Sequence, residues 1–401
     1  MIERTCSCEM GIHRAPLEEC VIERGAIYQL PRLLEKYHKV YMVCDENTYP
    51  ILGECAEQIL TKAGKFSHKY ILKGRVLPDA TAVGNVLIHL QDPKADSDIF
   101  QYSPKPDFIL AVGSGVINDV CRLVSYRVGI PYGIAGTAPS MDGYASAGSP
   151  ILFDGSKATI KATTPRYILA DLDVMKEAPF DMLLSGIGDM FGKYTGILDW
   201  ELARDYHGDY YCNEIAQEVL RATDLCLKNG YELKKRDPES IRNIMEGFLV
   251  TGLGMAFTGN SRPASGSEHI IAHAWELECV EKGEEPRFHG LEVCEATRIV
   301  AYMYKRLYEQ TEDLHLKSLI EKYLPYFDKV EKFCLEMKMP NVTEDYDMIL
   351  RGIRRALGLR DRYTILFYLR DTGLFEQYAE YAARRYLLSG NFPDSKRASY
   401  G

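Results

Sequence analysis

Short apolar runs alternate with longer amphipathic stretches from about residue 38 to residue 171. The runs have four or five residues rich in Val, Ile, Tyr and Phe, which is typical of β-strands, and the stretches between them have the length of helices. Runs that are apolar on both faces are typical of parallel strands covered by helices on both sides. The pattern predicts strands at 40–44, 69–72, 108–112, 132–136 and 167–171, with helices at 51–63, 80–91 and 116–128 between them.

The pattern changes beyond about residue 178, where almost every segment has helical periodicity. An aromatic stripe in the last helix (Phe375, Tyr378, Tyr381 and Tyr386) is typical of core packing. We therefore expect an α/β domain over 1–175 and an all-α domain over 176–401, with the functional site in the cleft between them. The predicted helices are 214–228, 241–257, 268–278, 291–308, 316–338, 344–357 and 373–388.

Composition and charge narrow the class of protein. The chain has 401 residues, 46% of them apolar and 26% charged, which is ordinary globular composition. The 48 Lys and Arg against 57 Asp and Glu give a net charge of −9, which argues against a nucleic-acid partner because phosphate backbones are bound by clustered basic residues. No apolar run approaches the roughly 18 residues of a membrane span, and the N-terminus lacks the apolar core of a secretory signal. We expect a cytoplasmic protein.

The cysteines agree with a reducing compartment. Eleven are scattered along the chain, an odd number without the density of a small disulfide-rich domain, so free thiols are expected. Cys6, Cys8, His13 and Cys20 could hold a metal, although the spacing lacks a second Cys pair. The alternative is a mobile N-terminal segment with spare thiols.

A glycine-rich turn follows the predicted strand 108–112. Gly113 and Gly115 let the backbone approach a pyrophosphate, and the helix that begins there offers free N–H groups to the anion. Asn118 stands where a dinucleotide fingerprint has its third glycine, so a plain tight turn remains the alternative.

Two further segments suit a nucleotide cleft. Asp45 ends the strand 40–44 and is the best candidate for a ribose contact, although a ribose acid usually follows the glycine turn by about 20 residues. The segment GTAPSMDGYAS begins at Gly136, directly after another strand, and carries small hydroxyl side chains that can donate hydrogen bonds. An ordinary connection is the alternative.

The histidines indicate a metal site. His269 and His273 are spaced i,i+4 and share one helix face, and His289 opens the next predicted helix after a Pro- and Gly-containing loop. Glu268 precedes the first His, so the segment does not match the H-E-x-x-H metalloprotease motif. Asp189, in SGIGD near the expected start of a helix, is the best-placed carboxylate. One Asp and two His with open positions would form a catalytic metal site, and two satisfied core histidines are the alternative.

These segments together resemble the glycerol-1-phosphate dehydrogenase family, including its bacterial araM-type members, within the dehydroquinate synthase-like and iron-containing alcohol dehydrogenase-like superfamily. The stretches GSGVIND, GTAPSMDGYAS, SGIGD, GSEHIIAH and HG occur in the family order between residues 45 and 290. The resemblance implies a Rossmann-like NAD(P)-binding domain followed by a helical metal-binding domain. It also implies reversible reduction of dihydroxyacetone phosphate to sn-glycerol 1-phosphate, an oxidoreductase step of phospholipid biosynthesis.

The resemblance also implies residue roles. Asp189, His269 and His289 would hold one divalent ion, zinc or nickel, with Asp189 also among the catalytic and substrate contacts. Asp142 and His273 would contact substrate and act in catalysis, and a neutral imidazole at His273 could pass a proton to the new hydroxyl. The acidic Asp45 favours NAD(H) and leaves NADP(H) open. The cofactor contacts would be Asp45, Gly113, Ser114, Gly115, Val116, Ile117, Thr137, Ala138, Pro139, Ser140 and Ser146.

Three rival functions remain open at this point. They are a polyol or alcohol dehydrogenase that acts on glycerol, a dehydroquinate synthase-like lyase or cyclase acting on a sugar phosphate, and a binding module that keeps only the fold. We expect a homodimer or a higher homo-oligomer. The phosphate anchor is not identified by any motif, and its candidates are Lys157, Lys161, Lys193 and Arg262.

Overall fold

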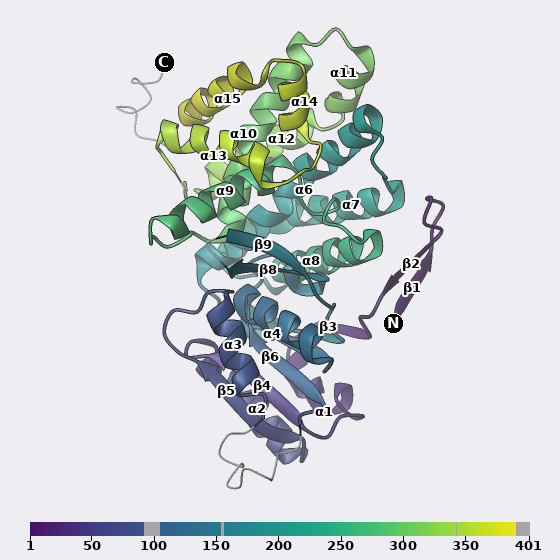
Figure 1. Ribbon diagram of the computed structural model, residues 1–401, viewed down its shortest axis with the longest axis vertical. Helices are drawn as coiled ribbons and strands as arrows, with labels where there is room; N and C mark the ends of the chain where they lie inside the picture. Colours follow the sequence, from purple (N-terminus) through teal and green to yellow (C-terminus); the bar gives the residue numbers. More distant parts are fainter. Residues whose placement is uncertain (92–104, 154–155, 342, 390–401) are drawn as a thin grey trace. The chain divides into compact units, whose positions relative to one another are not determined.

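The computed structural model describes residues 1–91, 105–153, 156–341 and 343–389, which fold into two compact units (Figure 1). The first unit contains Met1–Thr5, Ile12–Pro179 and Lys235–Gly259. The second contains Cys6–Gly11, Phe180–Lys234 and the chain from Asn260 onward. This division differs from a single boundary at residue 175, because the segment Lys235–Gly259 returns to the first unit.

A six-stranded parallel sheet forms the centre of the first unit. Its strand order is β3-β10-β7-β6-β4-β5. The five strands expected from the apolar runs are confirmed. The sixth, β3, was not predicted because it lies at the edge of the sheet and its sequence, ECVIE, is acidic at both ends. The strands are β3 (Glu19–Glu23), β4 (Val40–Asp45), β5 (Phe66–Leu72), β6 (Phe108–Gly113), β7 (Tyr132–Gly136) and β10 (Tyr167–Asp171).

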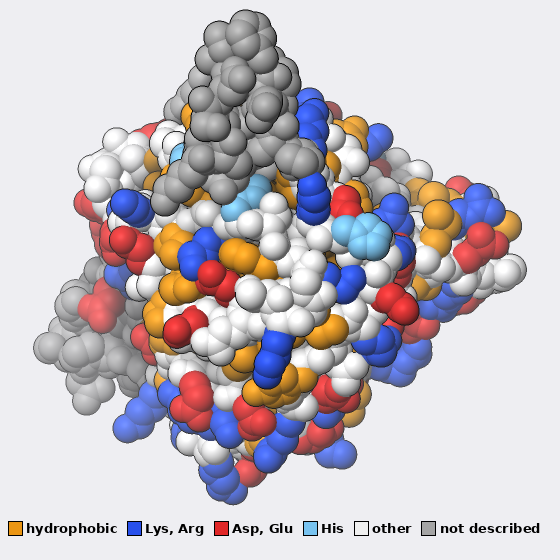
Figure 2. Space-filling view, turned by 90° about the horizontal axis from the view of Figure 1, so that it is seen from below, with side chains coloured by type: hydrophobic (Ala, Val, Ile, Leu, Met, Phe, Trp, Pro, Cys, Tyr) orange, Lys and Arg blue, Asp and Glu red, His pale blue; other side chains and the backbone are white. Residues whose placement is uncertain are grey.

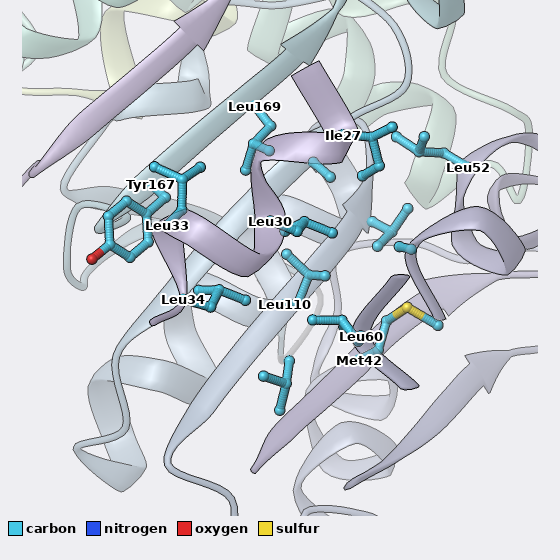
Figure 3. Close-up of a cluster of buried hydrophobic side chains, with 14 of the residues drawn as sticks. Ile27, Leu30, Leu33, Leu34, Met42, Leu52, Leu60, Leu110, Tyr167 and Leu169 are labelled. Carbon is cyan, nitrogen blue, oxygen red and sulfur yellow. The ribbon is translucent and has the colours of Figure 1, made fainter. Parts of the chain in front are cut away.

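Helices bury both faces of this sheet. On one face, Leu30, Leu33 and Leu60 pack onto Met42 and Leu110, whose side chains alternate with those of the opposite face (Figure 3). The other face packs against α4. The helical segments of the first unit are η1 (Ala26–Gln29), α1 (Leu30–Leu33), η2 (Tyr49–Gly53), α2 (Glu54–Lys62), α3 (Ala80–Ile88), α4 (Gly115–Val128), η3 (Gly143–Ala145), α5 (Leu172–Met175) and α8 (Pro238–Thr258).

Two antiparallel ribbons lie outside the main sheet. The pair β8 (Gly148–Phe153) and β9 (Ser156–Lys161) follows the polar loop after β7. The other pair, β1 (Ile2–Thr5) and β2 (Ile12–Ala15), makes the N-terminal segment a hairpin. The N-terminal segment therefore has regular secondary structure.

The second unit is helical, as predicted. One expected helix, 316–338, is in fact two, because Pro325 lies in the first turn of α12, where its missing N–H and fixed φ suit a helix start but not a helix interior. The elements are α6 (Phe180–His207), α7 (Asn213–Asn229), η4 (Gly230–Lys235), α9 (Ser267–Glu281), α10 (His289–Gln310), α11 (Leu314–Glu321), α12 (Leu324–Met337), α13 (Tyr346–Leu359), α14 (Ile365–Asp371) and α15 (Phe375–Ser389).

The aromatic stripe of the last helix packs as expected. Phe375, Tyr378 and Tyr386 are buried, and α15 lies against α10. The Tyr378 hydroxyl donates a hydrogen bond to Gln310 at 2.9 Å. Core packing is thus confirmed for these three residues, whereas Tyr381 is partly exposed and its ring lies against the Arg306 guanidinium.

A buried carboxylate joins four helices of the second unit. Asp199 of α6 accepts hydrogen bonds from the Ser267 backbone N–H (2.7 Å) and hydroxyl (2.6 Å) at the start of α9. It also accepts from the Tyr304 hydroxyl of α10 (2.6 Å) and from the Ile365 N–H at the start of α14 (2.7 Å). Burial and the nearby Glu268 carboxylate raise the pKa of Asp199 to about 6. The hydrogen bonds act in the opposite direction, since they favour the ionised form.

Acidic and basic side chains are interspersed over the face of the molecule seen in Figure 2. Within the described ranges, no helix combines the length and the low polarity that crossing a bilayer requires.

The Asp199 network generates a stability prediction. Asp199→Ala leaves four donors without their acceptor in a buried site, so we expect it to lower the free energy of unfolding by about 2–4 kcal/mol. Chemical denaturation measures the change. The matched control is Asp328→Ala, which removes an exposed ion pair with Lys305 and is expected to cost less than about 1 kcal/mol. Equal effects of the two substitutions would contradict the assigned role of Asp199.

Candidate active site

The predicted glycine turn lies at the carboxyl edge of the parallel sheet. β6 ends at Gly113, Ser114 is the N-cap, and α4 begins at Gly115. A Cβ on Gly115 would lie 2.8 Å from the Met141 side chain, so the turn has room only for glycine unless Met141 moves. The strand–turn–helix context that the sequence predicts for a phosphate-binding loop is therefore present.

Asp45 lies at the same edge of the sheet. It ends β4, the direct neighbour of β6, and its Oδ1 accepts hydrogen bonds from the N–H groups of Asn47 (2.9 Å) and Thr48 (2.7 Å). From β4 the chain adds β5 on one side and β6 on the other, so the strand order reverses here. Open α/β sheets bind their ligands at such a switch point, outside the carboxyl ends of the strands.

The second polar loop completes this edge. It follows β7, the other neighbour of β6, and its Ser140 hydroxyl lies 2.7 Å from the Ser114 hydroxyl. The Thr137 N–H donates to the Gly113 carbonyl at 3.0 Å. Three segments predicted to contact the cofactor thus meet at the carboxyl ends of β4, β6 and β7.

A buried side chain that the sequence analysis missed supports this loop. Arg122 of α4 is fully buried and donates to the Gly143 carbonyl, to the Gly148 carbonyl at 3.0 Å and to the Tyr132 hydroxyl at 3.0 Å. Asn118, at the position of the missing third glycine, donates to the Gly143 carbonyl at 3.2 Å. Asn118 and Arg122 therefore anchor the loop to α4. Asp142, the predicted substrate contact, is buried in this loop.

The predicted metal ligands come together in the second unit. One ligand atom each of Asp189, His269 and His289 lie within 4.8 Å of one another. His269 Nε2 is 3.2 Å from Asp189 Oδ1. Asp189 and His269 are buried, and the His289 side chain is 25% exposed. The three residues come from α6, α9 and the first position of α10.

Carboxylates orient both imidazoles. His269 Nδ1 lies 2.7 Å from Glu268 Oε1, and His289 Nδ1 lies 2.7 Å from Glu276 Oε1. An ionised carboxylate only accepts hydrogen bonds, so each Nδ1 carries the proton and each Nε2 keeps its lone pair. The buried Nε2 of His269 makes no hydrogen bond among the described residues. This is the arrangement that outer carboxylates impose on metal-binding histidines, so the residues present fit a divalent ion.

The charged side chains around the three candidate ligands also suit a divalent ion. Lys193 Nζ lies 2.8 Å from Asp189 Oδ1, and both side chains are completely buried. The carboxylates of Glu268 and Glu276 lie against the ligand imidazoles, and Lys193 is in direct contact with the Asp189 carboxylate. Burial alone would raise the pKa of Asp189, but the Lys193 ammonium holds it well below its usual range. The carboxylate is therefore ionised and able to bind a metal.

Close contact between two helices positions these ligands. The Gly290 N–H, at the start of α10, donates to the Ser185 hydroxyl of α6 at 3.1 Å. A Cβ on Gly290 would lie 1.9 Å from the Ser185 carbonyl oxygen, and one on Gly188 would lie 2.5 Å from the Gly290 carbonyl oxygen. The glycines of the SGIGD and HG motifs are thus required where the two backbones touch. This contact brings Asp189 beside His289.

One sequence expectation about Asp189 is wrong. The residue was placed near the start of a helix, whereas α6 begins at Phe180 and Asp189 lies well inside it. The hydrophobic positions after Pro179 had not been read as part of a helix. The ligand assignment itself does not depend on this difference.

The third histidine also lies at the site. The His273 ring stacks on the His289 ring with centroids 5.3 Å apart. His273, Glu276 and His289 also offer three ligand atoms within 4.8 Å. This second set is less suited to a metal, because its Glu276 already holds His289 Nδ1. His273 therefore lies beside the candidate ligand set of Asp189, His269 and His289.

The sequence did not predict that Glu268 and Glu276 contact the ligand imidazoles, nor that Lys193 contacts Asp189. The signal for Glu276 was present, since His269, His273 and Glu276 are spaced i, i+4 and i+7 on one helix face. The phosphate-anchor candidates are distributed differently. Lys193 is bonded to Asp189, Arg262 is paired with Asp209, and Lys157 and Lys161 lie on β9.

Comparison with known proteins identifies the class. Residues 21–179 match the family model described as iron-containing alcohol dehydrogenase. A solved structure of sulfoacetaldehyde reductase from Bifidobacterium kashiwanohense in complex with NAD+ superposes with a TM-score of 0.66 at 15% identity, covering 92% of this chain and 98% of that chain. The solved structure shows that the chain has the fold of this superfamily, and the family model matches a segment of the first unit.

Two curated relatives narrow this class. The chain is 30% identical over 381 residues to glycerol-1-phosphate dehydrogenase (NAD(P)+) from Bacillus licheniformis, covering 92% of each chain. It is 35% identical over 297 residues to the enzyme of the same name from Bacillus subtilis, covering 73% of this chain and 72% of the relative. The chain belongs to the glycerol-1-phosphate dehydrogenase family.

The contact between α6 and α10 generates a second prediction. Gly290→Ala forces a methyl group into the Ser185 carbonyl, so we expect it to lower the free energy of unfolding by about 3 kcal/mol or more and to reduce bound metal. Chemical denaturation and metal analysis measure the two effects. Gly358→Ala is the control, because it also adds a methyl group to a helix but has no neighbour within 4 Å. It is expected to be neutral or slightly stabilising. A Gly290→Ala protein with normal stability and metal would disprove the close-contact explanation.

Proposed function

We propose that this protein catalyses the reversible NAD(P)H-dependent reduction of dihydroxyacetone phosphate to sn-glycerol 1-phosphate with a divalent metal, zinc or nickel. The observation that carries the proposal is the buried Asp189–His269–His289 cluster, with carboxylate-oriented imidazoles, in a chain of this family. The names of the Bacillus relatives supply the substrate. The metal ligands in this proposal are Asp189, His269 and His289.

The bound ion would act as a Lewis acid on the ketone oxygen, and the reduced nicotinamide would supply the hydride. The protein's own residues prepare the site for this. Glu268 and Glu276 keep the proton on Nδ1 of each ligand imidazole, so that Nε2 faces the ion. Lys193 keeps Asp189 ionised and restricts its rotation.

His273 is the proposed proton donor for the nascent hydroxyl. Its ring stacks on His289, so it lies beside a metal ligand, and it is only partly buried. Imidazole titrates near neutral pH and can therefore donate a proton in reduction and accept one in the reverse reaction. Asp142 is proposed as a further substrate contact.

The nucleotide is proposed to bind at the carboxyl edge of the first unit's sheet. The glycine turn Gly113-Ser114-Gly115 and the start of α4 would hold the pyrophosphate. The carboxylate of Asp45 would accept a ribose hydroxyl and repel a 2′-phosphate, which favours NAD(H) over NADP(H). The remaining proposed contacts are Val116, Ile117, Thr137, Ala138, Pro139, Ser140 and Ser146.

The substrate assignment is tested by measuring NADH oxidation with dihydroxyacetone phosphate and with dihydroxyacetone. We expect kcat/KM to be at least about 100-fold higher for the phosphorylated ketone, because binding energy from a remote phosphate is used at the reacting carbon. The product is analysed on a chiral column against both glycerol phosphate enantiomers. Equal rates on both ketones, or faster glycerol oxidation, would favour a polyol dehydrogenase. Conversion of a sugar phosphate without net NADH consumption would favour a cyclase.

The residue roles are tested by separating metal binding from turnover. We expect His269→Ala to lose the active-site metal and turnover, because it removes a ligand of that metal, and His273→Ala to keep this metal but lose about 100-fold or more in kcat. Metal content is measured on the purified protein, beside steady-state kinetics. His315→Ala, an exposed histidine of the second unit, is the control and should change neither. Full metal occupancy in His269→Ala would rule out that ligand.

A further inference from the structure

A second group of metal-binding side chains lies outside the candidate active site. The turn of the N-terminal hairpin, Cys6–Gly11, is closed by two backbone hydrogen bonds, Cys6 N–H to the Gly11 carbonyl (2.9 Å) and Gly11 N–H to the Cys8 carbonyl (3.0 Å). Gly11 has φ of +66°, the left-handed conformation that favours glycine. The turn thus holds Cys6 and Cys8 in a compact loop, two residues apart.

A third thiol reaches this turn from a distant part of the second unit. Cys212, the residue directly before α7, has its Sγ 3.5 Å from Cys6 Sγ. Glu214 in the first turn of α7 accepts hydrogen bonds from the Ser7 N–H (2.9 Å) and hydroxyl (2.7 Å). The Tyr210 hydroxyl donates to Cys8 Sγ at 3.2 Å. Hydrogen bonds to Glu214 and from Tyr210 therefore hold the turn against the segment that carries Cys212. Cys6, Cys8 and Cys212 are called the thiol cluster below.

The distances fit a tetrahedral ion. The sulfur atoms of the thiol cluster lie within 4.8 Å of one another. Zn–S bonds of about 2.3 Å give tetrahedron edges of about 3.8 Å, so small side-chain movements would suffice. Hydrogen bonding by Tyr210 favours the thiolate form of Cys8, which is the form that binds metals.

We propose that Cys6, Cys8 and Cys212 bind a zinc ion. Thiolates are the ligands that structural zinc sites use most, and an ion bound there contributes folding energy. Cys20, considered with this segment from the sequence, lies on β3 instead. The ion would hold the hairpin turn on the start of α7. This inference does not depend on the proposed dehydrogenase activity.

Metal analysis of the full-length protein tests the proposal. We expect Cys212→Ser to contain about one zinc per chain less than the wild type, because a site that loses one of its three thiolates binds far more weakly. Cys55→Ser, a partly buried thiol of α2, is the matched control and should keep the wild-type zinc content. The variant His269→Ala separates the two sites, since it should retain the zinc of the thiol cluster. If the active-site assignment were wrong, the difference between Cys212→Ser and wild type would still measure the thiol site.

The absorption spectrum of the cobalt-loaded wild-type protein gives a first test that does not depend on the folding of any variant. Wild-type protein loaded with Co²⁺ should show a thiolate-to-cobalt charge-transfer band, which an Asp and two His ligands cannot produce because they contain no sulfur. The band should disappear in Cys8→Ser and remain in Cys55→Ser. Equal zinc in Cys212→Ser and wild type, or no thiolate band in the cobalt protein, would overturn the proposal. A Cys6–Cys212 disulfide found by mass spectrometry in the purified zinc-free protein would also overturn it, in favour of a redox-linked hairpin.

Discussion

The candidate metal centre depends on one steric contact, the touching backbones of α6 and α10. Gly290 lies so close to Ser185 that no larger residue fits, and the Gly290 N–H uses the Ser185 hydroxyl as its acceptor. An α-helix carries its ligands at fixed positions relative to its backbone, so this contact sets the separation of Asp189 and His289. The Asp199 network then ties α9, and with it His269, to the same helix. Helix packing therefore determines the ligand geometry.

Electrostatics makes this packing suitable for a cation. Burial of several carboxylates is costly unless positive charge compensates them. Lys193 compensates one charge of Asp189, and the carboxylates of Glu268 and Glu276 are hydrogen-bonded to the ligand imidazoles. The same contacts fix which ring nitrogen carries the proton. Charge compensation and ligand orientation thus have a common origin in three side chains around the cluster, Lys193, Glu268 and Glu276.

Local sequence patterns predicted the parts of this structure that depend on local chemistry. Buried parallel strands form short apolar runs that are visible in the sequence, so five of the six strands of the main sheet were predicted. The glycine turn at Gly113 was also placed correctly, between a strand and a helix. Residues that act through tertiary contacts were not found. Cys212 has no pattern around it that indicates a thiol neighbour 206 positions away, and Lys193 resembled a surface lysine until the burial of α6 was known. The metal ligands were assigned by family resemblance, with only the His spacing visible in the sequence itself.

The path of the chain has a consequence for how such proteins can change during evolution. The chain leaves the first unit after Pro179, returns at Lys235 as α8 and leaves again after Gly259. In α8, Gly252 packs so closely that a Cβ there would lie 2.7 Å from the Ala145 Cβ of the polar loop. A gene fragment that ended near residue 175 would encode a sheet without this support. The first unit is therefore not one continuous segment of the chain, and a recombination event that keeps this packing has to transfer both segments together.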